Sequence, residues 1–190
     1  MNNTHNRHLA RQRRHRRTVL AGTSVALAIG ALAALAIVRG TAGSSSSPDL
    51  AAATATGETS SMGMPVIVTP GSSSGVANAG GVTVEPAVWT MGRVPLNVAV
   101  RPSWTFTNTG NDTVTLGDPH VQINSGCCPG AMTYEGTNVL TPGATTSLTF
   151  ELSMHVGMDG AHDMTLHVPV AHADGTAETV DLTVTGDFSN

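Results

Sequence analysis

The sequence contains no lysine, and both the placement of its other charges and its shortage of aromatic residues limit what the chain can do. All nine cationic residues are arginines, seven of them in residues 1–39. Two arginines against 13 acidic residues give residues 40–190 a net charge of −11, whereas residues 1–39 carry +7. An acidic body without a basic, aromatic-rich patch repels phosphate, which argues against a nucleic-acid-binding protein.

Familiar catalytic motifs are also missing. The chain has no G-x-S-x-G, no H-E-x-x-H, no phosphate-binding glycine loop and no C-x-x-C. No charged residue flanks the only two cysteines, Cys127 and Cys128, to lower a thiol pKa. We therefore predict that the chain is not an enzyme, and a thiol-redox protein is the weaker alternative.

The N-terminal charge pattern predicts a membrane topology. A basic head, residues 1–17, precedes an uncharged run, residues 18–38, which is long enough to cross a bilayer. The positive-inside rule places the head in the cytoplasm and the rest of the chain outside it. Residues 18–39 are either a retained single-pass anchor in the cell membrane, which we favour, or a cleaved export signal.

Residues 40–81 are rich in serine, glycine and alanine and contain no aromatic residue. Such a composition buries too little apolar surface to offset the entropy of ordering, so we predict a flexible linker. All six aromatic residues follow position 81, which places the folded domain at residues 82–190.

Within residues 82–190 the apolar residues alternate with polar ones, and turn residues recur every eight to twelve positions. No convincing helix is present there. The pattern predicts an all-β fold, a single Ig-like antiparallel β-sandwich of about seven strands. The candidate strands are residues 82–85, 97–107, 113–123, 132–134, 145–154, 163–170 and 179–185.

Four short motifs in residues 88–143 carry a resemblance to a known family. They are Met-Gly-Arg-Val-Pro at residues 91–95, Trp-Thr-Phe-Thr-Asn-Thr-Gly-Asn at 104–111, Gly-Cys-Cys at 126–128 and Leu-Thr-Pro-Gly at 140–143. This region resembles the bacterial relatives of the ASH/HYDIN Ig-like domains. The chain departs from the family where the usual Cys-Gly-Cys is replaced by Gly-Cys-Cys-Pro. The resemblance implies an architecture and says little about activity.

Metal-binding residue types are concentrated in residues 154–167, which hold three methionines and three histidines. Thioether, imidazole and thiolate suit Cu(I), and the last two also suit Zn(II). Strand alternation assigns Met154 and Met164 to the core and His167 to a polar face. His120 is expected to be an exposed outer residue, and His172 falls at the opposite end of the sandwich. The remaining candidate ligands are Cys127, Cys128, His155, Met158 and His162.

Strand counting predicts that the Cys127–Cys128 turn and the hairpin at residues 155–162 lie at the same end of the sandwich, provided that residues 131–144 cross the domain. Metal ligation is the favoured role for the cysteine pair. A vicinal or redox-active disulfide, and cysteines packed as small apolar residues, remain open.

These observations predict a membrane-tethered, extracytoplasmic binding module for a soft metal ion, with copper the first choice and zinc the second. The expected partners are the membrane, through residues 18–38, and a metal-delivery or surface protein. The alternative is a structural or protein-interaction Ig-like module that binds no metal.

Overall fold

The computed structural model describes residues 54–190, and every regular element among them is a β-strand. The basic head, the membrane segment predicted at residues 18–39 and the first part of the predicted linker lie outside the described residues. In residues 54–190 no helix has the length and apolar character that a membrane crossing needs.

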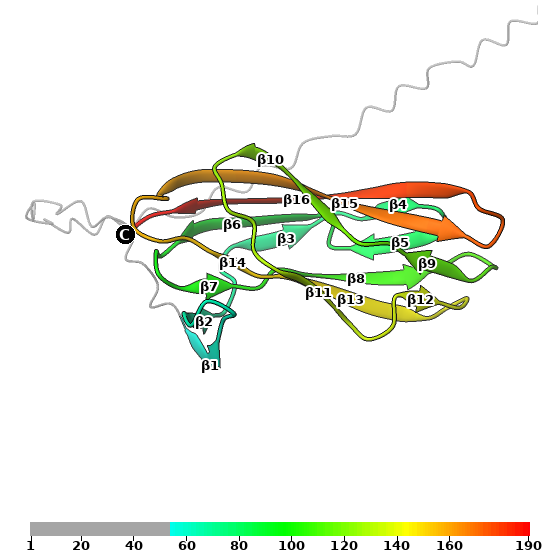
Figure 1. Ribbon diagram of the computed structural model, residues 1–190, viewed down its shortest axis with the longest axis horizontal. Helices are drawn as coiled ribbons and strands as arrows, with labels where there is room; N and C mark the ends of the chain where they lie inside the picture. The colour runs from blue at the N-terminus through cyan, green and yellow to red at the C-terminus, as the bar shows by residue number, and fades with distance from the viewer. Residues whose placement is uncertain (1–53) are drawn as a thin grey trace, which may run out of the picture. The chain divides into compact units, whose positions relative to one another are not determined.

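Sixteen strands follow one another along the described chain (Figure 1). They are β1 (Ala55–Thr59), β2 (Pro65–Ile67), β3 (Ser72–Ser74), β4 (Ala77–Ala79), β5 (Val82–Glu85), β6 (Val88–Val94), β7 (Ala99–Val100), β8 (Ser103–Asn108), β9 (Val114–Leu116), β10 (His120–Ser125), β11 (Met132–Glu135), β12 (Val139–Leu140), β13 (Thr145–Phe150), β14 (Leu152–Ser153), β15 (Gly160–His172) and β16 (Ala177–Phe188).

The strands form three sheets in a sandwich-like arrangement. The largest sheet has the order β12-β9-β15-β16-β6-β3, and β10 also pairs with β15. The second sheet has the order β11-β13-β8-β5-β4, and a small sheet, β1-β2-β7-β14, lies at one end (Figure 1). The all-β prediction is confirmed. The strand count of about seven is too low, because several long candidates are broken and others were missed.

Alternation along the strands builds the core. In β8, Trp104 and Phe106 are fully buried, whereas the hydroxyl side chains between them face outward. In β15, Met164, Leu166 and Val168 are likewise buried. Side chains of one strand point alternately to the two faces of a sheet, so each strand gives one apolar row to the space between the sheets. The core assignment of Met154 and Met164 is confirmed.

The folded region begins earlier than predicted. Residues 54–81, assigned to the flexible linker, contain β1 to β4, and Met64, Val66 and Ile67 are buried. Composition misled here, because this segment does not build a core of its own. It pairs its backbone with neighbouring strands and adds a few apolar side chains to a core that residues 82–190 supply.

The sandwich is not wholly antiparallel. β16 pairs with β6 in parallel, from Thr183 opposite Val88 to Phe188 opposite Val94. β2 and β7 form a second parallel pair. The motif at residues 91–95 therefore lies within or just after β6, a strand that sequence periodicity did not find.

Candidate metal site

The cysteine pair lies in the turn that carries the chain from one sheet to the other. β10 pairs with β15 in the large sheet, and β11, the next strand, pairs with β13 in the second sheet. Figure 1 shows this connection crossing between the layers. β10 ends with Ser125 opposite Asp163, beside the start of β15, where the hairpin at residues 154–159 also ends. The predicted shared end is confirmed.

The turn brings the two cysteines close together. Gly126 has a φ of 86° and Cys128 a φ of 62°, a left-handed conformation that is uncommon for a residue with a side chain. Cys127 is half-buried and Cys128 is exposed, and both are free thiols. A hydrogen bond with the Cys128 thiol, helped by partial burial, raises the pKa of Cys127, so the two sulfurs lie within hydrogen-bonding reach.

His162 is the buried member of the candidate ligand set, with a side chain in the second position of β15 after Gly160 and an exposed fraction of 5%. Its Nδ1 lies 3.0 Å from the Gly160 carbonyl oxygen. Because a carbonyl only accepts, Nδ1 carries the proton and the neutral ring presents an unprotonated Nε2. That Nε2 is buried and has no hydrogen-bond partner.

The cysteine turn packs directly against this imidazole. A methyl group added to Gly126 would stand 2.3 Å from Cδ2 and 2.8 Å from Nε2 of His162. On its other side the ring meets Phe188 edge to face, with the ring centres 5.0 Å apart. The residue before Cys127 is therefore in contact with the side of the ring that bears the unpartnered nitrogen.

The other two candidate ligands are placed differently. Met158 is partly buried and packs against the hydrophobic core. His155 is half-exposed, and its carbonyl accepts the Met158 amide in a tight turn. Within residues 54–190, no three His, Cys, Asp or Glu side chains are already grouped to hold a metal ion. The structure thus brings His162 to the cysteine turn and leaves the roles of His155 and Met158 as predictions.

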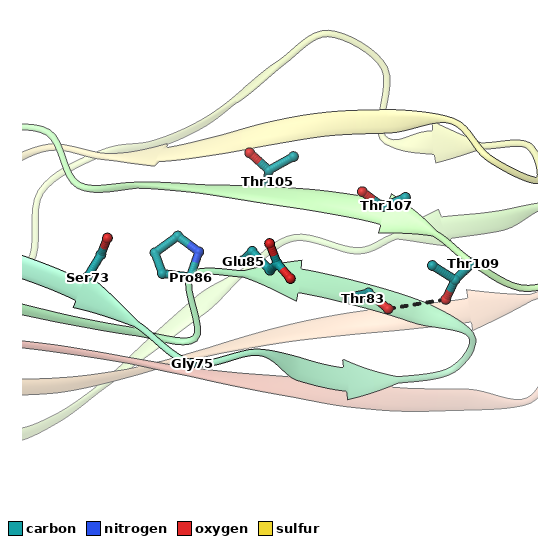
Figure 2. A pocket seen from close by; sticks show the side chains of 8 residues that line it. All are labelled: Ser73, Gly75, Thr83, Glu85, Pro86, Thr105, Thr107 and Thr109. Atoms are coloured by element: carbon teal, nitrogen blue, oxygen red, sulfur yellow. Dashed lines mark hydrogen bonds between the residues drawn. The ribbon is translucent and has the colours of Figure 1, made fainter.

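A separate hollow of about 610 Å³ lies over the second sheet, away from all five candidate ligands (Figure 2). Threonine hydroxyls of β5 and β8 dominate its lining, and Thr83 and Thr109 share a hydrogen bond of 3.2 Å. Glu85 is the ionisable residue in this lining. A row of hydroxyls with one carboxylate offers no group of soft ligands, so this hollow is not the predicted site.

Comparisons with known proteins give a fold and no family. A scan against known families finds no match, and neither does a search of curated proteins. The ASH/PapD-like domain of human CEP192 (PapD-like domain 7) resembles the chain with a TM-score of 0.44 at 12% identity, over 58% of this chain and 86% of that one. The resemblance to ASH-related Ig-like domains is thus confirmed at the level of the fold.

Two bacterial enzymes are also similar in fold. The VesB protease of Vibrio cholerae matches over 57% of this chain and 32% of its own, with a TM-score of 0.43 at 16% identity. The secreted serine protease VesC of the same organism matches over 52% and 21%, with a TM-score of 0.39 at 21% identity. The chain therefore spans about a third and a fifth of these two proteins.

These neighbours correct the prediction that the chain is not an enzyme. That prediction was drawn from missing catalytic motifs, yet a sandwich of this type occurs as one part of proteins named as proteases. The absence of motifs in one sandwich does not decide whether the protein that contains it has an activity. The similarity is one of fold and assigns no reaction to this chain.

Proposed function

We propose that the sandwich is an Ig-like scaffold for a soft-metal site, with copper as Cu(I) the first choice and Zn(II) the second. The observation that carries this proposal is the His162 Nε2, a buried ligand atom without a partner beside the cysteine turn. Buried polar atoms are nearly always hydrogen-bonded, so an unpaired one next to two thiols favours a site for a metal ion.

The surroundings of His162 match those of a metal-ligating histidine. Such a residue typically donates its second ring N–H to a carboxylate or a backbone carbonyl, which fixes the tautomer and the orientation of the ring. Here Gly160 provides the carbonyl. Phe188 holds one side of the ring, so the imidazole is positioned before any ion arrives.

The two thiols complete the soft character of the site. Their sulfurs already lie within hydrogen-bonding reach, and both can point to one ion from a turn. Thiolates and imidazole are ligands that Cu(I) and Zn(II) both accept. Because the grouping of three ligands is not preformed, binding requires a small movement of the turn, and Gly126 and Cys128 at its surface are exposed.

His155 and Met158 follow β14 in the same end of the sandwich, and we assign them outer roles. Their thioether and imidazole would distinguish copper from zinc, because a methionine sulfur suits Cu(I) and is not a usual zinc ligand. A zinc site would instead use Cys127, Cys128 and His162 with His155 as the fourth ligand.

We further propose that this module is tethered to the cell membrane through residues 18–38 and faces the extracytoplasmic side. The charge asymmetry supports this topology, because seven arginines precede or flank the apolar run and every acidic residue follows it. A metal-delivery or surface protein is the partner that such a tethered site would serve.

Titration of the full chain with Cu(I), against a coloured chelator that competes for it, tests the proposal. His5, His8 and His15 are first replaced by alanine, since tail histidines also bind metals. We expect one tight equivalent that is lost in Cys127→Ser and weakened at least about tenfold in His162→Gln. Met62→Ala, which removes a thioether that is 61% exposed, is the matched control and leaves binding unchanged.

Equal Cu(I) affinity in the parent chain and in the Cys127→Ser and His162→Gln variants, with each variant folded by circular dichroism, overturns the proposal. The pH dependence is a second check. The raised pKa of Cys127 keeps this thiol protonated at neutral pH, so an ion must displace its proton. Affinity therefore rises with pH across the neutral range.

A further inference from the structure

We infer that the outer face of the large sheet carries a second metal site, built by His120, His167 and Gln122, for a divalent ion such as Cu(II) or Zn(II). Sequence reasoning set both histidines aside as exposed residues. The pairing of β10 with β15, which periodicity alone does not give, brings them together.

Three side chains form one row across three neighbouring strands. His120 of β10 stands directly opposite His167 of β15, which in turn stands opposite Asp181 of β16. The two imidazole rings are stacked, with centres 4.8 Å apart and an angle of 26° between their planes. His167 Nδ1 lies 2.7 Å from the Asp181 carboxylate. The carboxylate thus accepts the proton of Nδ1 and directs Nε2 away from itself.

The second nitrogen of His167 meets another acceptor. Its Nε2 lies 3.3 Å from Gln122 Oε1. The Gln122 amide is oriented by its own NH₂ group, which donates to Asn124 Oδ1. Asn124 in turn donates from Nδ2 to Asp163 and Thr165, which fixes its orientation. The lone pairs of Nε2 and of Oε1 therefore face each other.

Two facing lone pairs favour a cation between them, and the neighbouring His120 supplies another imidazole. Two imidazoles with an amide oxygen are borderline ligands that suit Zn(II), Cu(II) and Ni(II). Asp181 has the position of the carboxylate that orients a metal-bound histidine. Asp181 serves as this orienting group rather than as a ligand, so the site needs no group of three His, Cys, Asp or Glu ligands.

This site is independent of the proposed Cu(I) site. Alternation in β15 points His162 into the core and His167 to the outer face, so the two histidines lie on opposite sides of one strand. The outer site contains no thiol and prefers divalent ions, whereas the cysteine site prefers Cu(I). Removing the cysteines therefore removes one site and leaves the other.

The test uses the full chain in which His5, His8 and His15 are alanine and both cysteines are serine. Zn(II) is titrated by calorimetry, and one equivalent of Cu(II) is examined by electron paramagnetic resonance. We expect one saturable site with hyperfine coupling to two imidazole nitrogens. Binding is lost in His167→Ala, one nitrogen coupling is lost in His120→Ala, and affinity falls about 10–100-fold in Asp181→Asn.

His172→Ala is the matched control, because His172 lies at the far end of β15, and this variant binds as the parent chain does. The inference is overturned if His120→Ala and His167→Ala bind Zn(II) as tightly as the parent. It is also overturned if the parent shows no saturable binding, in which case the cation between His167 and Gln122 is only a proton. A failure of the Cu(I) site does not affect these readouts, since the cysteines are already absent.

Discussion

Individual buried atoms separate function from packing in this molecule. Among residues 54–190, three buried side-chain polar atoms lack a hydrogen-bond partner: Trp104 Nε1, Thr146 Oγ1 and His162 Nε2. The first two belong to β8 and β13 in the second sheet. Only His162 adjoins the cysteine turn. An unpaired buried group costs stability, and at His162 a bound metal ion would offset that cost.

At Thr146 the unpaired hydroxyl has no such compensation, so its removal should stabilise the fold. Thr146→Val keeps the shape of the side chain and replaces a buried, unpartnered oxygen by a methyl group. We expect a gain of about 1 kcal/mol in the free energy of unfolding, measured by urea denaturation. A loss of stability would show that this hydroxyl is satisfied in solution.

Gly126 tests the contact between the cysteine turn and His162. Gly126→Ala would place a methyl group against the imidazole and also strain a φ of 86°, so it should displace His162 and weaken Cu(I) binding. Gly157→Ala is the control, because its φ is 95° but nothing lies within 4 Å of the added methyl. We expect it to cost about 1–2 kcal/mol of stability and to keep the affinity for Cu(I).

Equal Cu(I) affinities in the two glycine variants would contradict the contact between the turn and the imidazole. Binding is therefore compared at a temperature at which both variants are folded. In Gly126→Ala the destabilisation should exceed that of the control by a further amount of about 1–3 kcal/mol, because overpacking adds to the strain.

Among the elements, the β1–β2 segment is held to the sandwich by a charged cluster. Glu151, which follows β13, accepts hydrogen bonds from the Ser61 amide and hydroxyl and from Arg101. Arg101 also pairs with Glu58 of β1. Burial alone would raise the pKa of Glu151, but the hydrogen bonds from Ser61 and Arg101 outweigh it and lower the pKa below its ordinary value.

This lowered pKa predicts an acid-sensitive attachment. A carboxylate with a lower pKa in the folded state stabilises the fold above its unfolded-state pKa of about 4.3. That contribution is lost as the pH falls through the lower, folded-state value. We expect the urea midpoint to drop below about pH 4, and the drop to be smaller in Glu151→Gln. Glu58→Gln, at a carboxylate that is far more exposed, should keep the full pH dependence.

The early strands should be needed for full stability. Residues 54–81 contribute Met64, Val66 and Ile67 to the buried surface and pair with β5, β6 and β7. A fragment of residues 82–190 should therefore melt at a lower temperature than one of residues 54–190. Equal melting temperatures would mean that β1 to β4 do not support the sandwich.

At the scale of the whole molecule, the sequence predicted what depends on alternation within one strand and missed what depends on pairing between strands. The inward faces of β8 and β15 followed from period-two patterns, as did the buried places of Met154 and Met164. Short strands such as β3 and β4 carry no such pattern, because their hydrogen bonds come from neighbours. Composition therefore read them as linker.

The candidate site shows the same division. Strand counting placed the cysteine turn and the His162 hairpin at one end, because direction follows from chain order alone. The contact of Gly126 with His162 and the row of His120, His167 and Asp181 depend on register, which no single strand encodes. His155 and Met158 were chosen for chemical type, and their side-chain positions depend on how the turn packs.

X-ray absorption at the copper edge tests the central claim most directly. The full chain without its tail histidines is loaded with one equivalent of Cu(I) and compared with Cys127→Ser and His162→Gln. The proposed site predicts a first shell of two sulfurs and one imidazole nitrogen. One sulfur should be lost in Cys127→Ser, and the nitrogen should be lost in His162→Gln. A shell without sulfur, or one that is identical in all three proteins, would contradict the claim.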